Sequence, residues 1–187
     1  MDAQAIIDLL TPLVPGAVLS PCSGGADADA TPAIWTSAAD IVPVCFALRD
    51  TPGLEFHAFS NATAVDYHPR RTPRFDMVYH VVSPHRRARL RVKAQLGLDQ
   101  PIASVTAVWA GAGWCEREIY DLFGIVFDGH ADLRRLMMTE DWEGHPLRKD
   151  YPVQVRKDAQ TYMPLQVTAE EFRANMERDR YSRTRAK

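Results

Sequence analysis

The chain has 187 residues, a formal net charge of −2, and 46% hydrophobic and 25% charged residues. This near-neutral total excludes a protein that holds nucleic acid through bulk charge, because neutralising phosphates requires a basic excess on one surface. The chain has no run of the roughly 18 apolar residues that a membrane-spanning helix needs, and residues 1–15 carry no Lys or Arg, so we expect no transmembrane helix, no secretory signal and at most a peripheral membrane role.

The charge is distributed unevenly along the chain. Residues 1–60 sum to −6 and residues 61–100 to +5, whereas residues 101–170 sum to −4 and residues 171–187 to +3. Blocks of opposite sign are typical of surfaces that meet charged partners, although an ordinary solvated surface gives the same pattern.

The three cysteines, Cys22, Cys45 and Cys115, are far apart in the sequence. They form no C-x-x-C pair and no Cys/His cluster at zinc spacing. An odd and sparse cysteine count is typical of a reducing compartment. We therefore expect each cysteine to be a small buried side chain, and we expect the chain to carry no iron–sulfur cluster of its own.

The N-terminal third combines helical periodicity with short strands and loops. We expect, in chain order, a helix over 3–13 capped by Asp2, a loop over 20–32, a strand over 33–36, and a helix from the cap Asp40 through Leu48.

The middle of the chain is rich in strands. Strands are expected over 62–67, 74–83, 87–96 and 104–109. Within 87–96, Leu90, Val92 and Ala94 alternate with Arg89, Arg91 and Lys93, which indicates a half-buried antiparallel strand. The basic row then faces either plain solvent or an acidic neighbour.

A returning helix is expected over 111–123, with Gly124 as its left-handed C-cap. Its apolar arc contains Cys115, Ile119, Leu122 and Phe123, and its wet face is expected to carry Trp114, Arg117, Glu118 and Asp121. Arg117 and Asp121 are spaced for an i,i+4 pair. These elements predict a two-layer α+β domain with a mixed, mainly antiparallel sheet and packed helices.

After Gly129 the apolar residues have no steady period. We expect residues 1–127 to form the α+β core domain and residues 128–187 to form an extended segment and a C-terminal tail that dock on partners. The part over 128–152 is called the motif segment below, and we expect side-chain pairing to hold it. In the tail, Thr168–Glu171 matches a capping box and predicts a short basic helix.

Two sets of residues invite catalytic interpretations. The first is a metal set of His130, His145, Asp132 and Glu143, and the second is an acid/base set of Glu116, Glu118 and Asp121. Neither histidine spacing places two ligands on one helical face, as H-E-x-x-H does. No G-x-G-x-x-G, P-loop or G-x-S-x-G motif is present. The residues therefore point away from a self-contained active site.

Three runs in this region carry a family resemblance. They are E-R-E-I-Y-D-L-F-G-I-V-F-D-G-H (116–130), D-L-R-R-L (132–136) and D-W-E-G-H-P-L-R-K-D-Y-P (141–152). Together they strongly resemble the signature of the thirty-kilodalton subunit family of respiratory complex I, the NADH:quinone oxidoreductase, in its bacterial form. A looser likeness covers V-D-Y (65–67), V-Y-H (78–80) and S-V-T (104–106). Ala131 departs from the family, which usually has Pro after the G-H.

The resemblance implies a non-catalytic structural and assembly subunit of the peripheral arm of a proton-translocating enzyme. Electrons pass from NADH through FMN and iron–sulfur clusters, which lie on other subunits, to quinone. The implied partners are the large quinone-site subunit and a smaller cluster-bearing subunit, and the implied location is the cytoplasmic face of the bacterial cell membrane. The residues to which the resemblance assigns a docking role are Glu116, Arg117, Glu118, Asp121, His130, Arg134, Arg135, Trp142, His145, Arg148, Lys149 and Asp150. Gly124, Gly129 and Gly144 also match the motif.

Two alternatives stay open. Membrane-bound hydrogenases and ferredoxin-linked oxidoreductases related to complex I use a homologous subunit with similar motifs. A stand-alone metal-dependent hydrolase would use His130, His145 and Glu143.

Overall fold

The computed structural model describes residues 2–22 and 31–152, together with Thr168, Glu170, Arg173 and Ala174. Residues Met1–Pro152 form one compact unit, and Val153–Lys187 form a second unit. The tail helix that the capping box predicts lies mostly outside the described residues, of which Glu170, Arg173 and Ala174 are helical.

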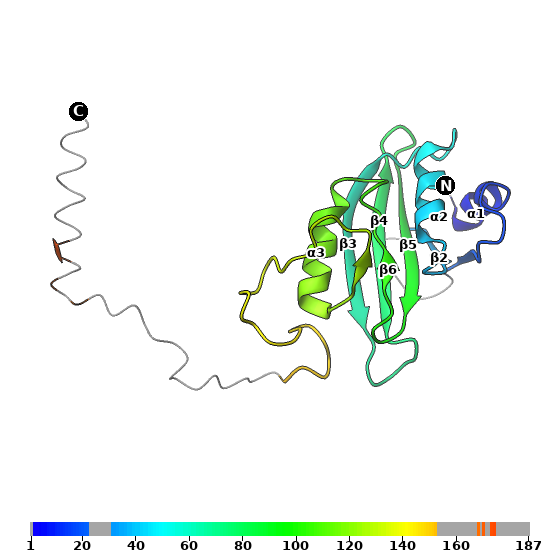
Figure 1. The fold of residues 1–187 in the computed structure, drawn as a ribbon. Coiled ribbons are helices and arrows are strands. Elements are labelled where there is room, and N and C mark those ends of the chain that lie inside the picture. Colours follow the sequence, from blue (N-terminus) through cyan, green and yellow to red (C-terminus); the bar gives the residue numbers. More distant parts are fainter. Residues whose placement is uncertain (1, 23–30, 153–167, 169, 171–172, 175–187) are drawn as a thin grey trace, which may run out of the picture. The chain divides into compact units, whose positions relative to one another are not determined.

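The N-terminal part contributes the first two helices (Figure 1). Helix α1 (Ala3–Leu10) begins at Asp2, whose carboxylate accepts the N–H of Ala3 at 2.7 Å. Helix α2 (Ile41–Asp50) follows Asp40, as expected, but Asp40 does not cap it through its side chain. That carboxylate instead accepts the hydroxyl of Ser37 at 2.6 Å.

A five-stranded sheet forms one layer. Its strands, in spatial order, are β1 (Ser20–Pro21), β2 (Ala33–Thr36), β5 (Ala88–Leu96), β4 (Phe75–Ser83) and β3 (Ala58–Asp66). Strands β3, β4 and β5 pair antiparallel, and β2 pairs parallel with β5, so the expected mixed, mainly antiparallel sheet is confirmed. The expected loop over 20–32 is wrong at its start, because Ser20 and Pro21 pair with β2.

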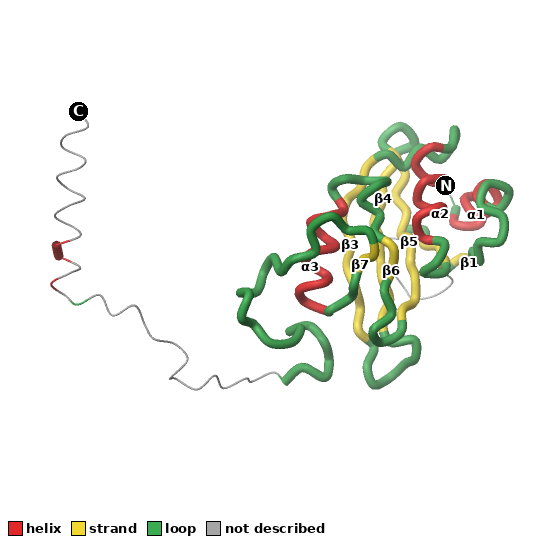
Figure 2. Tube along the Cα trace, viewed as in Figure 1, coloured by secondary structure: helices red, strands yellow, loops and turns green. Residues whose placement is uncertain are grey.

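The alternation in β5 divides the two faces of the sheet. Leu90, Val92 and Ala94 are 0–1% exposed, whereas Arg89 is exposed on the other face. The inward side chains of the sheet and the apolar arcs of all three helices belong to one core cluster. Figure 2 shows the red helices beside the yellow sheet, in agreement with the two-layer α+β prediction.

The expected strand over 104–109 is wrong. Strand β6 (Ile102–Ala103) ends before Ser104, and the chain then turns, with the N–H groups of Val108 and Trp109 both bonded to the carbonyl of Val105 at 2.9 Å. The N–H of Val105 is taken by the carboxylate of Glu116 at 2.8 Å, so it is not available to a strand ladder. Strand β6 pairs parallel with β7 (Phe127–Asp128).

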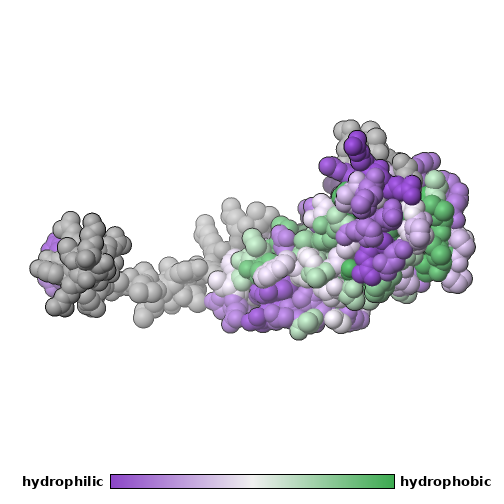
Figure 3. All heavy atoms as spheres, turned by 90° about the horizontal axis from the view of Figure 1, so that it is seen from above, coloured by the Kyte–Doolittle hydropathy of each residue, from purple (hydrophilic) through white to green (hydrophobic). Residues whose placement is uncertain are grey.

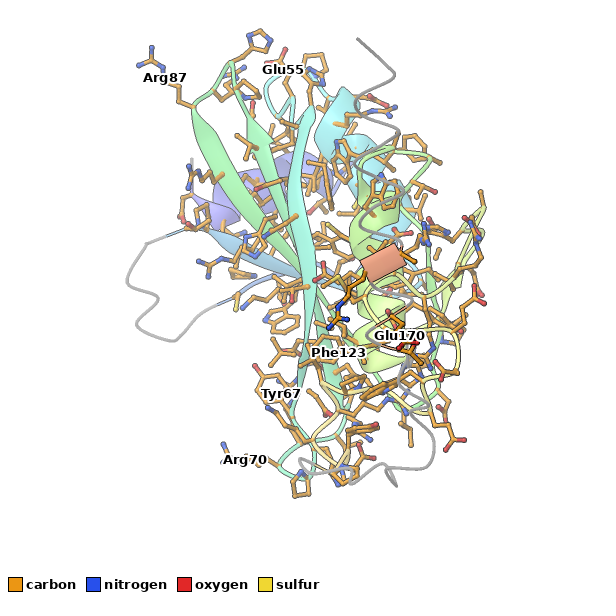
Figure 4. The ribbon with its side chains drawn as sticks, turned by 90° about the vertical axis from the view of Figure 1, so that its left-hand side faces the viewer. Glu55, Tyr67, Arg70, Arg87, Phe123 and Glu170 are labelled. Atoms are coloured by element: carbon orange, nitrogen blue, oxygen red, sulfur yellow. The ribbon has the colours of Figure 1, made fainter. Side chains whose placement is uncertain are left out.

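Helix α3 (Ala112–Phe123) connects these two short strands and packs against β3. It ends at Gly124, whose φ of 74° confirms the predicted left-handed C-cap. In Figure 4, Phe123 at the end of α3 lies toward the same end of the sheet as Tyr67 and Arg70, while Glu55 and Arg87 lie at the opposite end. The end of α3 and the β3–β4 connection are therefore close to one another.

Candidate functional site

The motif segment follows β7 and contains no helix or strand over 129–152. Figure 2 shows it as a long loop beside α3. The segment is held by hydrogen bonds from side chains, which is the arrangement expected from its irregular sequence. The bonds fall into three groups, at the middle of α3, at its C-terminal end and at the end of β3.

Asp121 anchors the first part of the segment. Its Oδ2 accepts three consecutive backbone N–H groups, those of Leu136 at 2.9 Å, Met137 at 2.7 Å and Met138 at 2.8 Å. Its Oδ1 accepts Nη1 of Arg135 at 2.7 Å. Burial raises the pKa of Asp121, but these four hydrogen bonds outweigh it and lower the pKa below its ordinary value.

This placement corrects the expected wet face of α3. Asp121 is 0% exposed because the motif segment covers it, and periodicity within one helix does not reveal what covers the helix. The expected Arg117–Asp121 pair is also replaced. Arg117 donates instead to the carbonyls of Arg134 and Arg135 at 3.2 Å each.

Glu116 is the second buried acid of α3 and is also 0% exposed. Its carboxylate accepts the hydroxyl of Ser104 at 2.6 Å and the N–H of Val105 at 2.8 Å, and it lies 4.0 Å from Nε2 of His130. Burial raises the pKa of Glu116, and the bonds from Ser104 and Val105 only partly oppose this. Glu116 therefore joins the S-V-T turn to α3.

The C-terminal end of α3 is capped by the motif segment. The ring Nδ1 of His145 lies 2.9 Å from the carbonyl of Asp121, and Arg148 donates to the carbonyls of Phe123 and Gly124. A cation at the last carbonyls of a helix satisfies unpaired acceptors and complements the helix dipole. Burial lowers the pKa of His145, the bond to Asp121 raises it, and the nearby arginines lower it further, so the net shift is downward.

Gly124 makes this capping possible. A Cβ at this position would lie 2.4 Å from Nη2 of Arg148 and 2.5 Å from Cδ2 of His145. Glycine is therefore required both for the positive φ and for the close approach of these two side chains.

Asp66 and Arg74 anchor the end of the segment. Arg74 Nη2 donates to Asp66 at 2.6 Å and to Asp150 at 2.7 Å, and the N–H of Lys149 donates to Asp66 at 2.9 Å. Burial raises the pKa of Asp66, but hydrogen bonds from Arg74 and from the N–H groups of Lys149 and His68 lower it to about 2. Arg74 had no assigned role in the sequence, and the only available signal for the pair was Asp66 in the V-D-Y motif.

The remaining predicted docking residues lie nearer the solvent. Glu118 and Arg134 are exposed, and Arg134 pairs with Asp132 at 2.6 Å. Trp142 is half-buried, and Lys149 is exposed although its backbone is bonded. The structure therefore brings Asp121 and Arg135 together, and Asp150 with Arg74, while Glu118 and Arg134 remain on the surface.

The two histidines of the metal alternative each direct a ring nitrogen at a backbone carbonyl, His130 at Gly113 (3.1 Å) and His145 at Asp121 (2.9 Å). Over residues 2–22 and 31–152, no group of three or more His, Cys, Asp or Glu side chains is placed to hold a metal ion. In the same part of the chain, no helix combines the length and apolarity needed to cross a bilayer. The arrangement thus positions a surface segment, and it offers the hydrolase alternative no ligand set.

The fold and site define an α+β domain that holds an irregular surface segment against its third helix. Residues 34–157, more than half of the chain, match the family described as "Respiratory-chain NADH dehydrogenase, 30 Kd subunit", and the chain belongs to this family.

Curated relatives agree with this assignment. A protein of Sinorhizobium medicae is 43% identical over 75% of this chain and 73% of its own length. One of Methylobacterium radiotolerans is 47% identical over 73% of this chain and 66% of its own length, and one of Roseiflexus is 39% identical over 87% and 91%. All three are named as the same subunit of NADH-quinone oxidoreductase.

A solved structure shares the fold. A chain of the membrane-bound sulfane sulfur reductase, described as an archaeal respiratory membrane complex, superposes with a TM-score of 0.65 over 88% of this chain and 94% of its own. Its sequence identity is 20%, so this likeness concerns the fold alone.

Proposed function

We propose that the chain is a non-catalytic structural and assembly subunit in the peripheral arm of a proton-translocating NADH:quinone oxidoreductase. The observation that carries this proposal is the family match over residues 34–157, together with relatives 39–47% identical that are named as subunits of this enzyme. FMN and the iron–sulfur clusters would lie on other subunits, and so would the chemistry of NADH and quinone.

The docking role divides between two kinds of residue. The buried group (Glu116, Asp121, Arg135, His145, Arg148 and Asp150) holds the motif segment in one conformation through the bonds described above. The more exposed group (Arg117, Glu118, Arg134, Trp142 and Lys149) would meet the partners, which we take to be the large quinone-site subunit and the cluster-bearing subunit. His130 belongs with the buried group, because it ties the turn after β7 to Gly113. The chain would reach the cytoplasmic face of the cell membrane only through the assembled complex.

Deletion of the gene in its host, followed by complementation with this chain, tests the proposal. We expect membranes of the deletion strain to lose NADH:quinone activity and the assembled complex on native gels, and we expect the chain to restore both. NADH oxidation by an artificial acceptor should persist in the detached FMN-bearing part. A complete complex with full quinone activity in the absence of the chain would contradict the proposal.

The non-catalytic part of the proposal needs its own measurement. Glu116→Gln changes the most deeply buried acid of α3 while keeping its size. We expect complexes that contain this variant to show an unchanged turnover per assembled complex. A lower turnover in complexes that assemble normally would give Glu116 a chemical role.

The fold likeness to the sulfane sulfur reductase chain supports a second candidate, a subunit of a hydrogenase-like or ferredoxin-linked relative of complex I. The purified complex distinguishes the two candidates. Oxidation of NADH supports the first, whereas activity only with hydrogen or reduced ferredoxin supports the second.

A further inference from the structure

We propose that Trp114, Arg117 and Met137 form the energetic centre of the contact with a partner subunit, and that the partner presents an apolar pocket with a hydrogen-bond acceptor on its rim. The inference rests on the proposed docking function and names the surface that would carry it. We call this surface the Trp114–Met137 surface; it consists of Trp114, Arg117, Glu118, Leu136 and Met137.

The surface is continuous across two parts of the chain. Trp114, Arg117 and Asp121 lie at i, i+3 and i+7 and so share one face of α3. The guanidinium of Arg117 lies 5.3 Å from the ring centroid of Trp114, and it donates from Nε and Nη2 to the carbonyls of Arg134 and Arg135. One helical turn further on, Asp121 holds the N–H of Met137. Arg117 therefore lies between Trp114 and the strip that carries Met137.

Three large apolar side chains on this surface face the solvent. Trp114 is 63% exposed, Met137 is 64% exposed and Leu136 is 37% exposed. Single exposed apolar residues are ordinary, but a Trp and a Met gathered around an Arg have the composition of an interface centre. Figure 3 shows hydrophilic and hydrophobic residues interspersed over the face seen from above, so exposure alone would not identify this group.

The backbone that carries these side chains is fixed before any partner binds. Residues 136–138 are bonded to the buried carboxylate of Asp121, and Trp114 stands on a regular helix below the guanidinium of Arg117. Binding would therefore order few additional groups, which favours affinity. The acids that pair in this region are Asp121 with Arg135 and Asp132 with Arg134, so their charges are already matched within the chain.

The chemistry of the partner follows from what remains unused. Nη1 of Arg117 makes no hydrogen bond to the described part of the chain, and it can donate to a carbonyl or carboxylate oxygen. Glu118 is exposed on the same face, so the surface has no strong net charge and does not select an acidic partner by charge alone. An apolar pocket for Trp114 and Met137 with one acceptor opposite Arg117 fits these groups. A protein partner is favoured because the chain belongs to a family of respiratory-complex subunits.

The test uses the full-length chain and the complex purified from a strain that lacks this subunit. We expect Trp114→Ala to weaken binding of the chain to that complex by at least about tenfold, and Met137→Ala by a smaller factor, because truncation of a central aromatic removes most of the contact energy. Arg117→Lys should also weaken binding, since Lys keeps the charge but lacks the planar fork. Leu98→Ala and Val18→Ala are the matched controls, because both side chains are exposed (54% and 71%) but belong to neither α3 nor the motif segment.

The outcomes separate this inference from the proposed function. If the wild-type chain binds and both Trp114→Ala and Met137→Ala bind equally tightly, the inference is wrong while the docking function stands. If the wild-type chain does not bind, the docking function itself fails. If the pure chain dimerises and Trp114→Ala abolishes the dimer without weakening binding to the complex, a second copy is the occupant and the inference is overturned. Thermal melting of each variant must match the wild type, as expected for exposed positions.

Discussion

The sheet and the motif segment satisfy their backbone groups in different ways. In β3, β4 and β5 the N–H and carbonyl groups pair with one another across nine-residue strands. In the motif segment the N–H groups of residues 136–138 and of Lys149 are taken by the carboxylates of Asp121 and Asp66. A ladder distributes its stability over many equivalent bonds, whereas the segment depends on a few side chains. Single substitutions should therefore affect the segment far more than the sheet.

The largest effect is expected from Asp121→Ala. The change leaves three N–H groups and the guanidinium of Arg135 without their acceptor, and the loss of one partner from a buried ion pair typically costs about 3–5 kcal/mol. We expect hydrogen exchange to become fast over residues 130–150 while β3–β5 stay protected. Glu118→Ala, at an exposed acid of the same helix, should leave the exchange pattern unchanged. Uniform loss of protection across the sheet would show that the two regions unfold as one.

A pair of glycines isolates the role of close packing. Gly124→Ala should destabilise the chain by about 2 kcal/mol or more, because the new Cβ meets Arg148 and His145 in addition to the unfavourable positive φ. Gly129→Ala should cost about 1 kcal/mol, since Gly129 has a φ of 82° but nothing within 4 Å of its added Cβ. Urea denaturation of both variants measures the difference. Equal losses would mean that His145 and Arg148 move aside at no cost.

Acid should act on the two regions in opposite directions. The folded pKa of Asp66 is about 2, below its ordinary value of 3.8, so its contribution of about 2 kcal/mol is present above pH 4 and is lost as the pH falls toward 2. The pKa of Glu116 is raised by burial, so its contribution is present below its ordinary value of 4.5 and is lost as the pH rises through the folded pKa.

Stability measured as a function of pH with two variants separates these contributions. Asp66→Asn should remove the loss near pH 2–4, and Glu116→Gln should remove the decline above pH 4.5. A stability profile of Glu116→Gln that parallels the wild type above pH 4.5 would contradict the assigned shift.

The smallest effect on stability is expected from Arg134→Ala. Arg134 and its partner Asp132 are both exposed, and exposed pairs contribute little to folding. We expect an unchanged melting temperature but weaker assembly of the complex, if Arg134 meets a partner. Blue-native electrophoresis of the complementing strain measures assembly. A lower melting temperature would place Arg134 with the residues that hold the segment.

The elements of the sheet were predictable because their periodicity is local. Strand β2 occupies the expected residues 33–36, and the alternation within β5 correctly assigned Leu90, Val92 and Ala94 to the core. The strand expected over 104–109 failed because Glu116, twelve residues away from Ser104, takes the N–H of Val105. An acceptor that distant leaves no trace in the local pattern.

The contacts of the site were less predictable than the segment that makes them. The motif runs drew attention to residues 116–152, but the amphipathic pattern placed Asp121 toward solvent when its carboxylate is buried. Arg74 lies 76 residues from Asp150, and only the folded chain brings them together. Polar side chains that are buried by a neighbouring segment resemble surface residues in the sequence, so periodicity misassigns them.

The ties of the motif segment also set the entropy of its chain. The carboxylate of Asp121 closes a loop of 15 residues to Leu136, and the carbonyl of Gly124 closes one of 24 residues to Arg148. Asp66 reaches Lys149 across 83 residues, but the sheet already positions both ends. Closing a loop costs free energy that grows only with the logarithm of its length, so once the first tie forms the others close shorter remaining stretches. The segment should therefore adopt its conformation in sequence from α3 outward, after the sheet has folded and before a partner arrives.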